Sequence, residues 1–206
     1  MRIGVDFDNT IVSYDLLFYK VASEAGLIPP DIARTKLGVR DYLRKIGKED
    51  LWTEMQGYVY GARMNEAIVF PGVPGFLSWA RDQGVIVPII SHKAQYPFLG
   101  PKYDLHEAAR RWVETYLVDE HGDLVARDQV LFELTKEEKL KRIIAVGCDY
   151  FIDDLPEILM AREFPSGTGR ILFDPEGHHP LDGEITVMSS WRDILRHFEA
   201  KWVLKH

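Results

Sequence analysis

Short apolar runs alternate with amphipathic stretches along most of this chain. The apolar runs have the length of β-strands and lie at 2–7, 85–90, 130–134, 150–152 and 170–173. The amphipathic stretches have helical periodicity and lie at 76–82, 104–118, 135–146, 155–164 and 190–202. Strands that alternate with helices are typical of a parallel sheet with crossover helices. The pattern therefore predicts an α/β protein.

Residues 14–70 interrupt this alternation, because their pattern is helical and shows no strand-like alternation. Apolar residues recur at helical spacing in three stretches, 14–26, 39–46 and 48–64. The run Pro71–Gly75 then ends the block with two prolines and two glycines. We expect these residues to form a helical unit inserted into the α/β sequence.

One residue departs from the strand pattern. Pro88 lies midway along the apolar run 85–90, and proline is rare inside central strands because it cannot donate to the hydrogen-bond ladder. Either this strand is locally irregular, or it begins later than the apolar run does.

Paired carboxylates follow the first apolar run, in Asp6-Phe7-Asp8-Asn9-Thr10. Open α/β sheets form their sites at the carboxyl ends of the strands. Extended backbone returns Asp8 to the side of Asp6, so both carboxylates can converge on one cation or one reacting phosphorus. Buried carboxylates cost several kcal/mol unless a cation or hydrogen bonds compensate them. The alternative is a strand that ends in an ordinary Asp-Asn turn.

A second pair, Asp153-Asp154, follows the apolar run 150–152 in the same way. Such a pair can instead form a helix N-cap with a further Asp in the first turn. Two strands that each end in paired carboxylates make a shared cation the better explanation. Mg²⁺ requires hard oxygen ligands, so the two pairs together predict a magnesium site.

Composition and charge limit the class of partner. The 206 residues are 46% hydrophobic and 28% charged, which is the balance of a globular protein. The net charge of −7, with no basic run, argues against a nucleic acid polymer as partner. The longest apolar stretch is too short to cross a bilayer, and the first residues do not resemble a signal peptide. With Cys148 as its single cysteine, we expect a cytoplasmic protein without disulfides.

The first carboxylate run resembles the signature of the haloacid dehalogenase-like superfamily, an apolar strand followed by Asp-x-Asp-x-Thr. The resemblance implies that Asp6 is the nucleophile and binds Mg²⁺ through its carboxylate. It implies that Asp8 is the general acid/base and offers its main-chain carbonyl to the metal. A second Asp at this position is the phosphatase-type form, which disfavours dehalogenase chemistry.

The order of the remaining motifs implies the architecture of the same superfamily. The resemblance implies a Rossmann-like, three-layer parallel sheet as the catalytic core, formed by residues 1–13 and 71–206. The helical block 14–70 then corresponds to a small all-helical cap that closes over the site, excludes water and selects substrates.

Three further motifs of the superfamily have counterparts here. Ser91 follows an apolar strand and would hydrogen-bond the phosphoryl oxygens. Asp154 would bind the cation directly, and Asp153 would act through water or orient a lysine. That lysine should lie at the start of the preceding helix, where Lys136 and Lys139 both qualify. We prefer Lys136, because it shares a helical face with the apolar residues and lies in the exposed first turn.

These residues predict a Mg²⁺-dependent phosphatase that hydrolyses a small phosphomonoester, such as a nucleotide or sugar phosphate, through an aspartyl-phosphate. A phosphotransferase on the same scaffold differs only in the acceptor of the phosphoryl group. A non-catalytic binding or regulatory protein is the alternative from another class, although such a protein is free to lose Asp6 or Asp154 and this chain retains both.

Other candidate residues favour structural roles. His178-His179 lies among prolines and glycine, so a surface turn is favoured over a metal site. Gly167-Thr168-Gly169 lacks the rest of a dinucleotide fingerprint. A set of large side chains at helical spacing is expected in the core rather than in a pocket for a planar substrate; it comprises Trp52, Met55, Tyr58, Tyr60 and Met64. Cys148 lies away from every motif and is expected to be buried.

Overall fold

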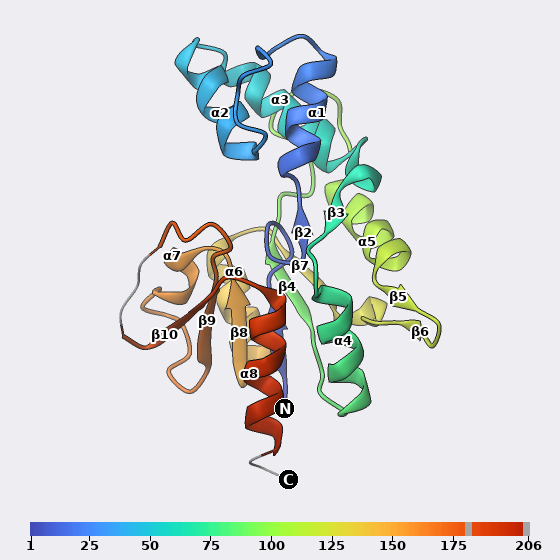
Figure 1. Ribbon diagram of the computed structural model, residues 1–206, viewed down its shortest axis with the longest axis vertical. Coiled ribbons are helices and arrows are strands. Elements are labelled where there is room, and N and C mark those ends of the chain that lie inside the picture. Colours follow the sequence, from blue (N-terminus) through green and yellow to red (C-terminus); the bar gives the residue numbers. More distant parts are fainter. Residues whose placement is uncertain (180–182, 204–206) are drawn as a thin grey trace.

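The computed structural model describes residues 1–179 and 183–203, and its centre is a six-stranded sheet in the order β10-β9-β8-β1-β4-β7 (Figure 1). The strands are β1 (Ile3–Val5), β4 (Ile89–His92), β7 (Val130–Glu133), β8 (Tyr150–Asp153), β9 (Gly169–Phe173) and β10 (Ile185–Met188). Each neighbouring pair in this sheet is parallel. The predicted α/β class with a Rossmann-like parallel sheet is therefore confirmed.

Helices cover both faces of the sheet, which gives three layers (Figure 1). One cluster of buried side chains joins one face to α4 (Val73–Asp82), α5 (Leu105–Tyr116) and α8 (Trp191–Val203). A second cluster joins the other face to α6 (Lys136–Val146) and α7 (Pro156–Leu159). Because both faces are buried, the strands read as continuous apolar runs rather than as alternating ones.

Successive residues of a central strand belong to different clusters, as the two-residue period of a strand requires. In β8, Ile152 lies in the first cluster and Phe151 in the second. Gly4 of β1 faces the second cluster, where an added Cβ would lie 2.6 Å from Phe151 Cδ2 and 2.8 Å from Cys148 Sγ. Glycine at this position therefore permits the close packing of β1 on Phe151. Cys148 is buried, as predicted.

β4 begins later than its apolar run, which decides between the two alternatives for Pro88. The strand spans Ile89–His92, so Pro88 precedes it. The carbonyl of Pro88 accepts a hydrogen bond of 3.0 Å from the Val5 amide. The ladder with β7 begins at Ile89, so the N–H that proline lacks is not needed there.

Residues 14–70 form a helical block beyond the end of the sheet, at the top of Figure 1. Its helices are α1 (Asp15–Glu24), α2 (Lys36–Lys45) and α3 (Glu49–Tyr60), followed by the 3-10 turn η1 (Met64–Glu66). A short antiparallel ribbon of β2 (Val12–Ser13) and β3 (Ile68–Val69) connects the block to the sheet. The helices were expected, whereas β3 was not. The division of the chain into a core and a separate cap stays a prediction.

Some elements differ from the predicted pattern. β10 was not predicted, nor was the small ribbon of β5 (Val118–Asp119) and β6 (Gly122–Asp123). Helix α7 ends at Leu159, earlier than the amphipathic stretch 155–164, because the chain then closes turns in which the Phe164 amide bonds to the Ala161 carbonyl. The 3-10 turn η2 (Arg127–Gln129) precedes β7.

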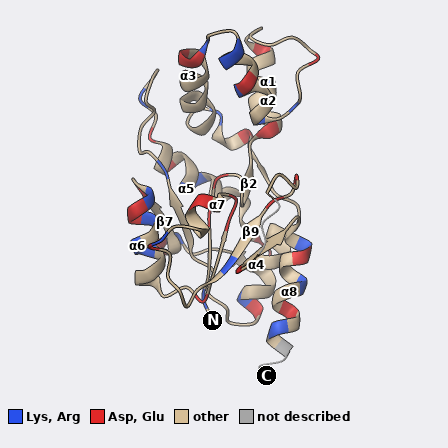
Figure 2. Cartoon of the chain, turned by 90° about the vertical axis from the view of Figure 1, so that its left-hand side faces the viewer, with Lys and Arg blue, Asp and Glu red and all other residues tan. Residues whose placement is uncertain are grey.

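The outer surface carries charges of both signs. Figure 2, coloured by residue type, shows acidic and basic residues together along helices such as α6 and α8. Within residues 1–179 and 183–203, no helix has the length and apolar character needed to cross a membrane.

Candidate active site

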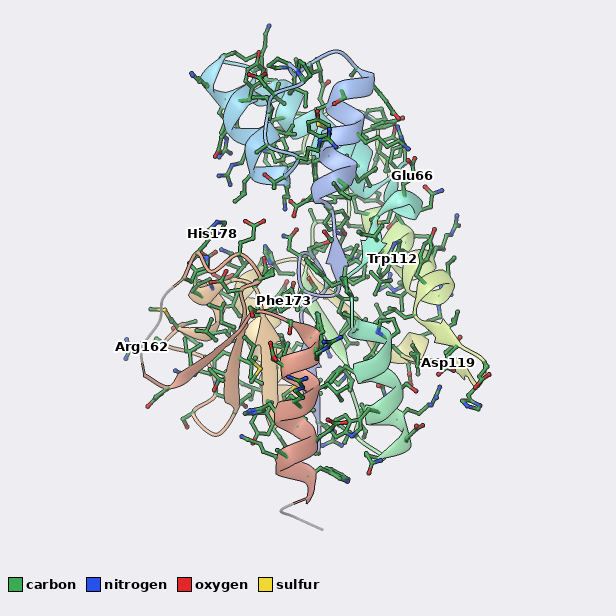
Figure 3. The ribbon with its side chains drawn as sticks, in the orientation of Figure 1. Glu66, Trp112, Asp119, Arg162, Phe173 and His178 are labelled. Atoms are coloured by element: carbon green, nitrogen blue, oxygen red, sulfur yellow. The ribbon has the colours of Figure 1, made fainter. Side chains whose placement is uncertain are left out.

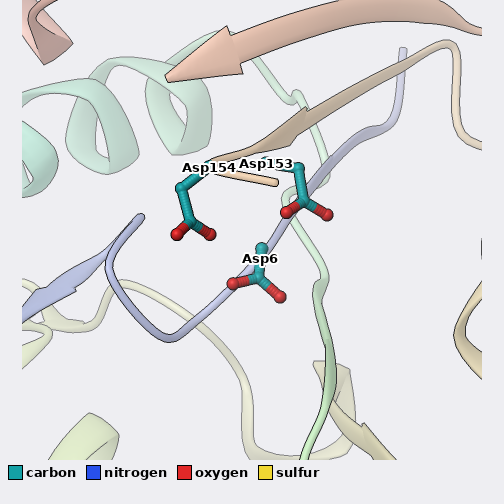
Figure 4. A group of neighbouring side chains, drawn as sticks. All are labelled: Asp6, Asp153 and Asp154. Carbon is teal, nitrogen blue, oxygen red and sulfur yellow. The ribbon is translucent and has the colours of Figure 1, made fainter. Parts of the chain in front are cut away.

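The carboxylates of Asp6, Asp153 and Asp154 meet where β1 and β8 end side by side. The two strands pair in parallel with Val5 opposite Ile152, and the Asp6 amide bonds to the Ile152 carbonyl at 2.9 Å. Each of the three aspartates places a carboxylate oxygen within 4.8 Å of the other two, and Figure 4 shows these groups around one space. Asp6 of the first pair therefore lies with both members of the second pair, whereas the Asp8 carboxylate is not part of this group. The arrangement could hold a cation.

Asp6 and Asp153 are both buried, at 4% and 0% exposure, and share one ammonium group. The Nζ of Lys139 lies 2.6 Å from Asp6 Oδ1 and 2.6 Å from Asp153 Oδ2, and its side chain is fully buried. Burial lowers the pKa of Lys139, but the Asp153 and Asp6 charges outweigh this effect and raise it overall. Lys139 is therefore a permanent cation between the ends of the two strands.

The preference for Lys136 is corrected by this geometry. Lys136 lies on the surface, half exposed, and forms its ion pair with Glu157 of α7. Both lysines share a helical face with the apolar residues of α6, but Lys139 lies one turn further along and reaches the strand ends. The exposed first turn was the wrong criterion, because a lysine that compensates buried carboxylates must itself be buried. Thr135 caps the same helix, since its Oγ1 accepts from the Glu138 amide.

Asp8 lies in a separate hydrogen-bonded group beside this cluster. Lys93 Nζ lies 2.9 Å from both carboxylate oxygens of Asp8, and the Tyr14 hydroxyl donates to Asp8 Oδ1 at 2.5 Å. Burial raises the pKa of Asp8, but Lys93 and the Tyr14 hydrogen bond outweigh it, so the pKa is lowered overall. Burial and then the Asp8 charge raise the pKa of Tyr14, so its hydroxyl stays protonated and remains a donor.

The turn after β1 places these groups. The Phe7 carbonyl accepts from the amides of Ile11 and Val12, and Asn9 adopts φ 59°, a left-handed conformation that asparagine tolerates. The turn brings Thr10 Oγ1 to 3.4 Å from Asp154 Oδ1.

Asp154 is the least compensated carboxylate of the cluster. Burial raises its pKa well above the ordinary value, and the charges of Asp6 and then Asp153 add to this effect. A weak hydrogen bond from Thr10 offsets little of this cost. The three carboxylates carry more negative charge than the single ammonium of Lys139 balances, and their oxygens are hard ligands. This donor set suits a divalent cation.

A cavity of about 380 Å³ opens above the cluster, with Asp6, Asp8 and Asp154 in its floor. Ser91, at the end of β4, lines it and is 1% exposed. The walls come from the helical block and from the loop that connects β4 to α5; they include Lys36, Thr53, Gln56, Tyr60, Lys93, Tyr96, Pro97 and Phe98. The volume is that of a site for a small molecule.

The loop between β4 and α5 lies tightly against α3 of the helical block. A Cβ added to Gly57 would lie 2.6 Å from Pro97 Cβ, and one added to Gly61 would lie 2.4 Å from Tyr103 Cβ. The two glycines let this loop approach the helix, and Gly57 and Pro97 both line the cavity.

The end of the helical block is also fixed to the sheet domain. The indole of Trp112, labelled in Figure 3, donates to the Ala67 carbonyl at 3.0 Å, and its ring lies 5.5 Å from that of Phe7. These two contacts link α5 to the turn before β3 and to Phe7, which lies between Asp6 and Asp8.

The other sequence candidates do not belong to the carboxylate cluster. The amides of His178 and His179 both donate to Asp174 in a loop after β9, where Figure 3 shows His178. Of the large side chains at helical spacing, Tyr60 lines the cavity, whereas three are buried in the core, namely Trp52, Met55 and Met64. Tyr58 is partly exposed and lies outside the cavity lining.

Three residues of the site carried little signal in the sequence. Lys93 directly follows β4, and its contact with Asp8 follows from the parallel neighbours β1 and β4. Tyr14 and Lys36 belong to the helical block, whose position over the sheet no periodicity reveals.

Comparison with known proteins agrees with this architecture. No family model and no curated protein matches the sequence. Solved structures match over the whole chain, among them an archaeal β-phosphoglucomutase from Pyrococcus sp. strain ST 04, with a TM-score of 0.58 and 13% identity over 100% of this chain and 99% of that one.

Two further structures show the same likeness. A HAD-superfamily hydrolase of subfamily IA from Geobacter sulfurreducens has a TM-score of 0.56 and 12% identity, over 95% of both chains. A predicted phosphoglycolate phosphatase from Haemophilus somnus has a TM-score of 0.50 and 15% identity, over 95% of this chain and 96% of that one. At 12–15% identity the likeness concerns the fold alone, and the fold that the resemblance implied is confirmed.

Proposed function

We propose that this protein is a Mg²⁺-dependent phosphatase that hydrolyses a small phosphomonoester. The observation that carries the proposal is the meeting of the Asp6, Asp153 and Asp154 carboxylates, with Lys139 bonded to Asp6 and Asp153 and with Asp6 and Asp154 lining a small cavity. A fold alone does not define an activity, so the argument rests on what these side chains can do.

Asp6 is the proposed nucleophile. A carboxylate oxygen of Asp6 attacks phosphorus, the ester P–O bond breaks, and the leaving oxygen takes a proton from Asp8. Water then attacks the aspartyl-phosphate and gives its proton to Asp8, which releases inorganic phosphate and restores the Asp6 carboxylate. One acid/base thus serves both steps.

Asp8 must be protonated in the first step and ionised in the second, and its contacts affect which of these two states is favoured. The ion pair with Lys93 favours the ionised carboxylate, which is the base of the second step. For the first step the Asp8–Lys93 pair must open, and a phosphate dianion in the cavity competes with Asp8 for the ammonium of Lys93. Tyr14 holds the carboxylate in place meanwhile.

The remaining residues would bind and neutralise the phosphoryl group. Ser91 supplies a hydroxyl at the adjacent strand end, and Lys139 offsets the charge of Asp6. Asp6 and Asp154 would hold Mg²⁺, together with the Asp8 carbonyl, while Asp153 orients Lys139. Such an ion supplies positive charge that stabilises the transferring phosphoryl group.

We propose that residues 14–70 act as the cap, with the ribbon of β2 and β3 as its connection to the core. Lys36 and Tyr60 of the block already line the cavity, so its position decides how much of the substrate is enclosed. Exclusion of water would favour phosphoryl transfer to the intended acceptor. A cytoplasmic location remains part of the proposal.

The test is turnover of p-nitrophenyl phosphate with and without Mg²⁺, measured on the wild type and on Asp6→Asn. We expect release of inorganic phosphate that requires both Mg²⁺ and Asp6, and a phosphorylated Asp6 in mass spectra of acid-quenched wild type. Undiminished turnover by Asp6→Asn would refute the assignment. Transfer to an added alcohol in preference to water would instead identify a phosphotransferase.

A further inference from the structure

Lys36 is a cation of the cavity that the proposed chemistry does not use. Lys139 is paired with Asp6 and Asp153, and Lys93 is paired with Asp8. Lys36 lines the same cavity, but within the described part of the chain no carboxylate lies within ion-pair distance of its ammonium group. Its Nζ lies 5.6 Å from the ring centre of Tyr60 and 5.9 Å from that of Phe18.

The backbone of Lys36 is held firmly at the start of α2. Its amide donates to Asp15 Oδ1 of α1 at 2.7 Å, and the preceding Thr35 caps the helix by accepting from the Gly38 amide at 3.0 Å. A Cβ on Gly38 would lie 2.6 Å from the Ala33 carbonyl oxygen, so glycine permits this tight turn. The side chain therefore leaves a fixed point and crosses two aromatic rings to reach the cavity.

Helix physics does not explain a lysine here. A cation in the first turn opposes the helix dipole; α2 has no acidic residue of its own in that turn, and the carboxylate at this helix end is Asp15 of α1, which bonds to the Lys36 amide. The group nevertheless stays charged: burial lowers the pKa of Lys36, but Tyr60, Asp8 and Asp154 outweigh this effect and raise it overall. Lys36 thus keeps its positive charge although the charge is unfavourable to the helix. A cation on the wall of a cavity is suited to binding an anion.

Lys36 and Lys93 line the same cavity from different elements. Both ammonium groups lie over the same ring, since Lys93 Nζ is 4.7 Å from the ring centre of Tyr60. Lys93 contacts Asp8, which belongs to the reacting end of the cavity, whereas Lys36 projects from the helical block. The cavity is thus lined by two lysines from different elements, of which, among the residues that the structure describes, only Lys93 is paired with a carboxylate.

We propose that Lys36 binds a second anionic group of the substrate, so that the preferred substrate is a small phosphomonoester that also carries a carboxylate or a second phosphate. This inference rests on the proposed function and deepens it. Tyr60 and the wall formed by Tyr96 and Phe98 would contact the carbon skeleton between the two charged ends.

The test uses pairs of esters that differ only in the second charge. Glycerol 3-phosphate and 3-phosphoglycerate differ in a hydroxymethyl group and a carboxylate, and fructose 1-phosphate and fructose 1,6-bisphosphate differ in a second phosphate. For each pair we would measure the ratio of kcat/KM values in the wild type, Lys36→Met, Lys36→Arg and Lys45→Met. Lys45 lies exposed at the other end of α2, so its loss removes the same charge away from the cavity.

We expect the wild type to prefer the more anionic ester of at least one pair, which also identifies the anion as carboxylate or phosphate. Lys36→Met should lower that preference about 10- to 100-fold, as the loss of a charge-assisted hydrogen bond implies. Lys36→Arg should restore most of it, and Lys45→Met should leave the ratio unchanged. Equal losses for both members of a pair would overturn the inference and assign Lys36 to the phosphate common to both.

A binding measurement separates this inference from the proposed function. Calorimetry of the same esters with Asp6→Asn and with the double variant Asp6→Asn/Lys36→Met reports affinity without turnover. A preference for the more anionic ester that depends on Lys36 would support the inference even if the wild type hydrolysed nothing. Absence of any preference in both assays would refute the inference, whereas Asp6-dependent hydrolysis would leave the proposed function intact.

Discussion

Replacement of Lys139 by methionine tests the central feature of the site, a buried ammonium group between two buried carboxylates. Lys139 is fully buried, and its Nζ lies 2.6 Å from both Asp6 Oδ1 and Asp153 Oδ2. Methionine retains the length of the side chain and removes the charge. Loss of one partner from a buried ion pair costs about 3–5 kcal/mol, because the remaining charge is left without compensation. Total stabilities of domains are about 5–15 kcal/mol, so the loss is a large share.

The pH dependence of this loss follows from the same contacts. Burial raises the pKa of Asp153, the Asp6 charge adds to this, and the Lys139 ammonium opposes it. Without Lys139 the pKa rises further, so the folded variant holds a proton that the unfolded chain, with a carboxyl pKa of about 3.9, has lost. Stability then falls as pH rises between these two values, by about 1.4 kcal/mol per pH unit for one proton. The deficit of Lys139→Met should therefore be smaller at pH 5 than at pH 8.

Urea unfolding of the wild type, Lys139→Met and Lys136→Met at pH 5 and pH 8, without divalent cations, measures these effects. Lys136 lies on the same helix and pairs with Glu157 at the surface, so its replacement should cost no more than about 1 kcal/mol. Equal losses in the two variants would contradict the assignment of Lys139. A deficit that grew on acidification would contradict the reasoning about the carboxylates.

Three further predictions concern other parts of the molecule. Asp8→Asn should retain the metal and lower turnover about 10²–10⁴-fold, most for esters with poor leaving groups, as steady-state kinetics with a leaving-group series would show. Asp154→Ala should weaken Mg²⁺ binding in calorimetric titration, and unchanged affinity would remove its carboxylate from the metal site. Gly61→Ala should cost about 1–3 kcal/mol in urea unfolding, because its Cβ would lie 2.4 Å from Tyr103 Cβ. Gly75→Ala in α4, with no atom within 4 Å of its added Cβ, is the matched control and should be neutral or slightly stabilising.

The meeting of carboxylates at the strand ends could be predicted from the sequence, because each strand end is marked by a local pattern of residues. Each aspartate pair follows a short apolar run, and parallel strands end at one edge of a sheet, so Asp6 and Asp154 had to be neighbours once β1 and β8 were adjacent. Lys139 could not be chosen in the same way. Helical periodicity puts Lys136 and Lys139 on one face, and only the position of α6 along the strands decides which of them reaches Asp6.

The boundary of β4 shows a similar limit. The apolar run around Pro88 marks what is buried, whereas the start of the strand depends on which neighbour needs a backbone donor. The carbonyl of Pro88 serves Val5, and the ladder to β7 starts one residue later. The sequence thus indicates which residues are buried, whereas the hydrogen-bond register of the strand depends on its partner strand.

The charges that line the cavity are not all balanced by one another, and this imbalance gives the site its polarity. Within residues 1–179 and 183–203, Asp6 and Asp8 each lie in an ion pair, whereas neither Asp154 nor Lys36 has an oppositely charged partner within ion-pair distance. One unpaired carboxylate suits a cation, and one unpaired ammonium suits an anionic group. Because both side chains line the same cavity, a metal ion and an anionic substrate would each compensate one of them. Binding of the metal should therefore strengthen binding of the substrate, and the reverse. Each compensates a buried charge that would otherwise remain without a partner.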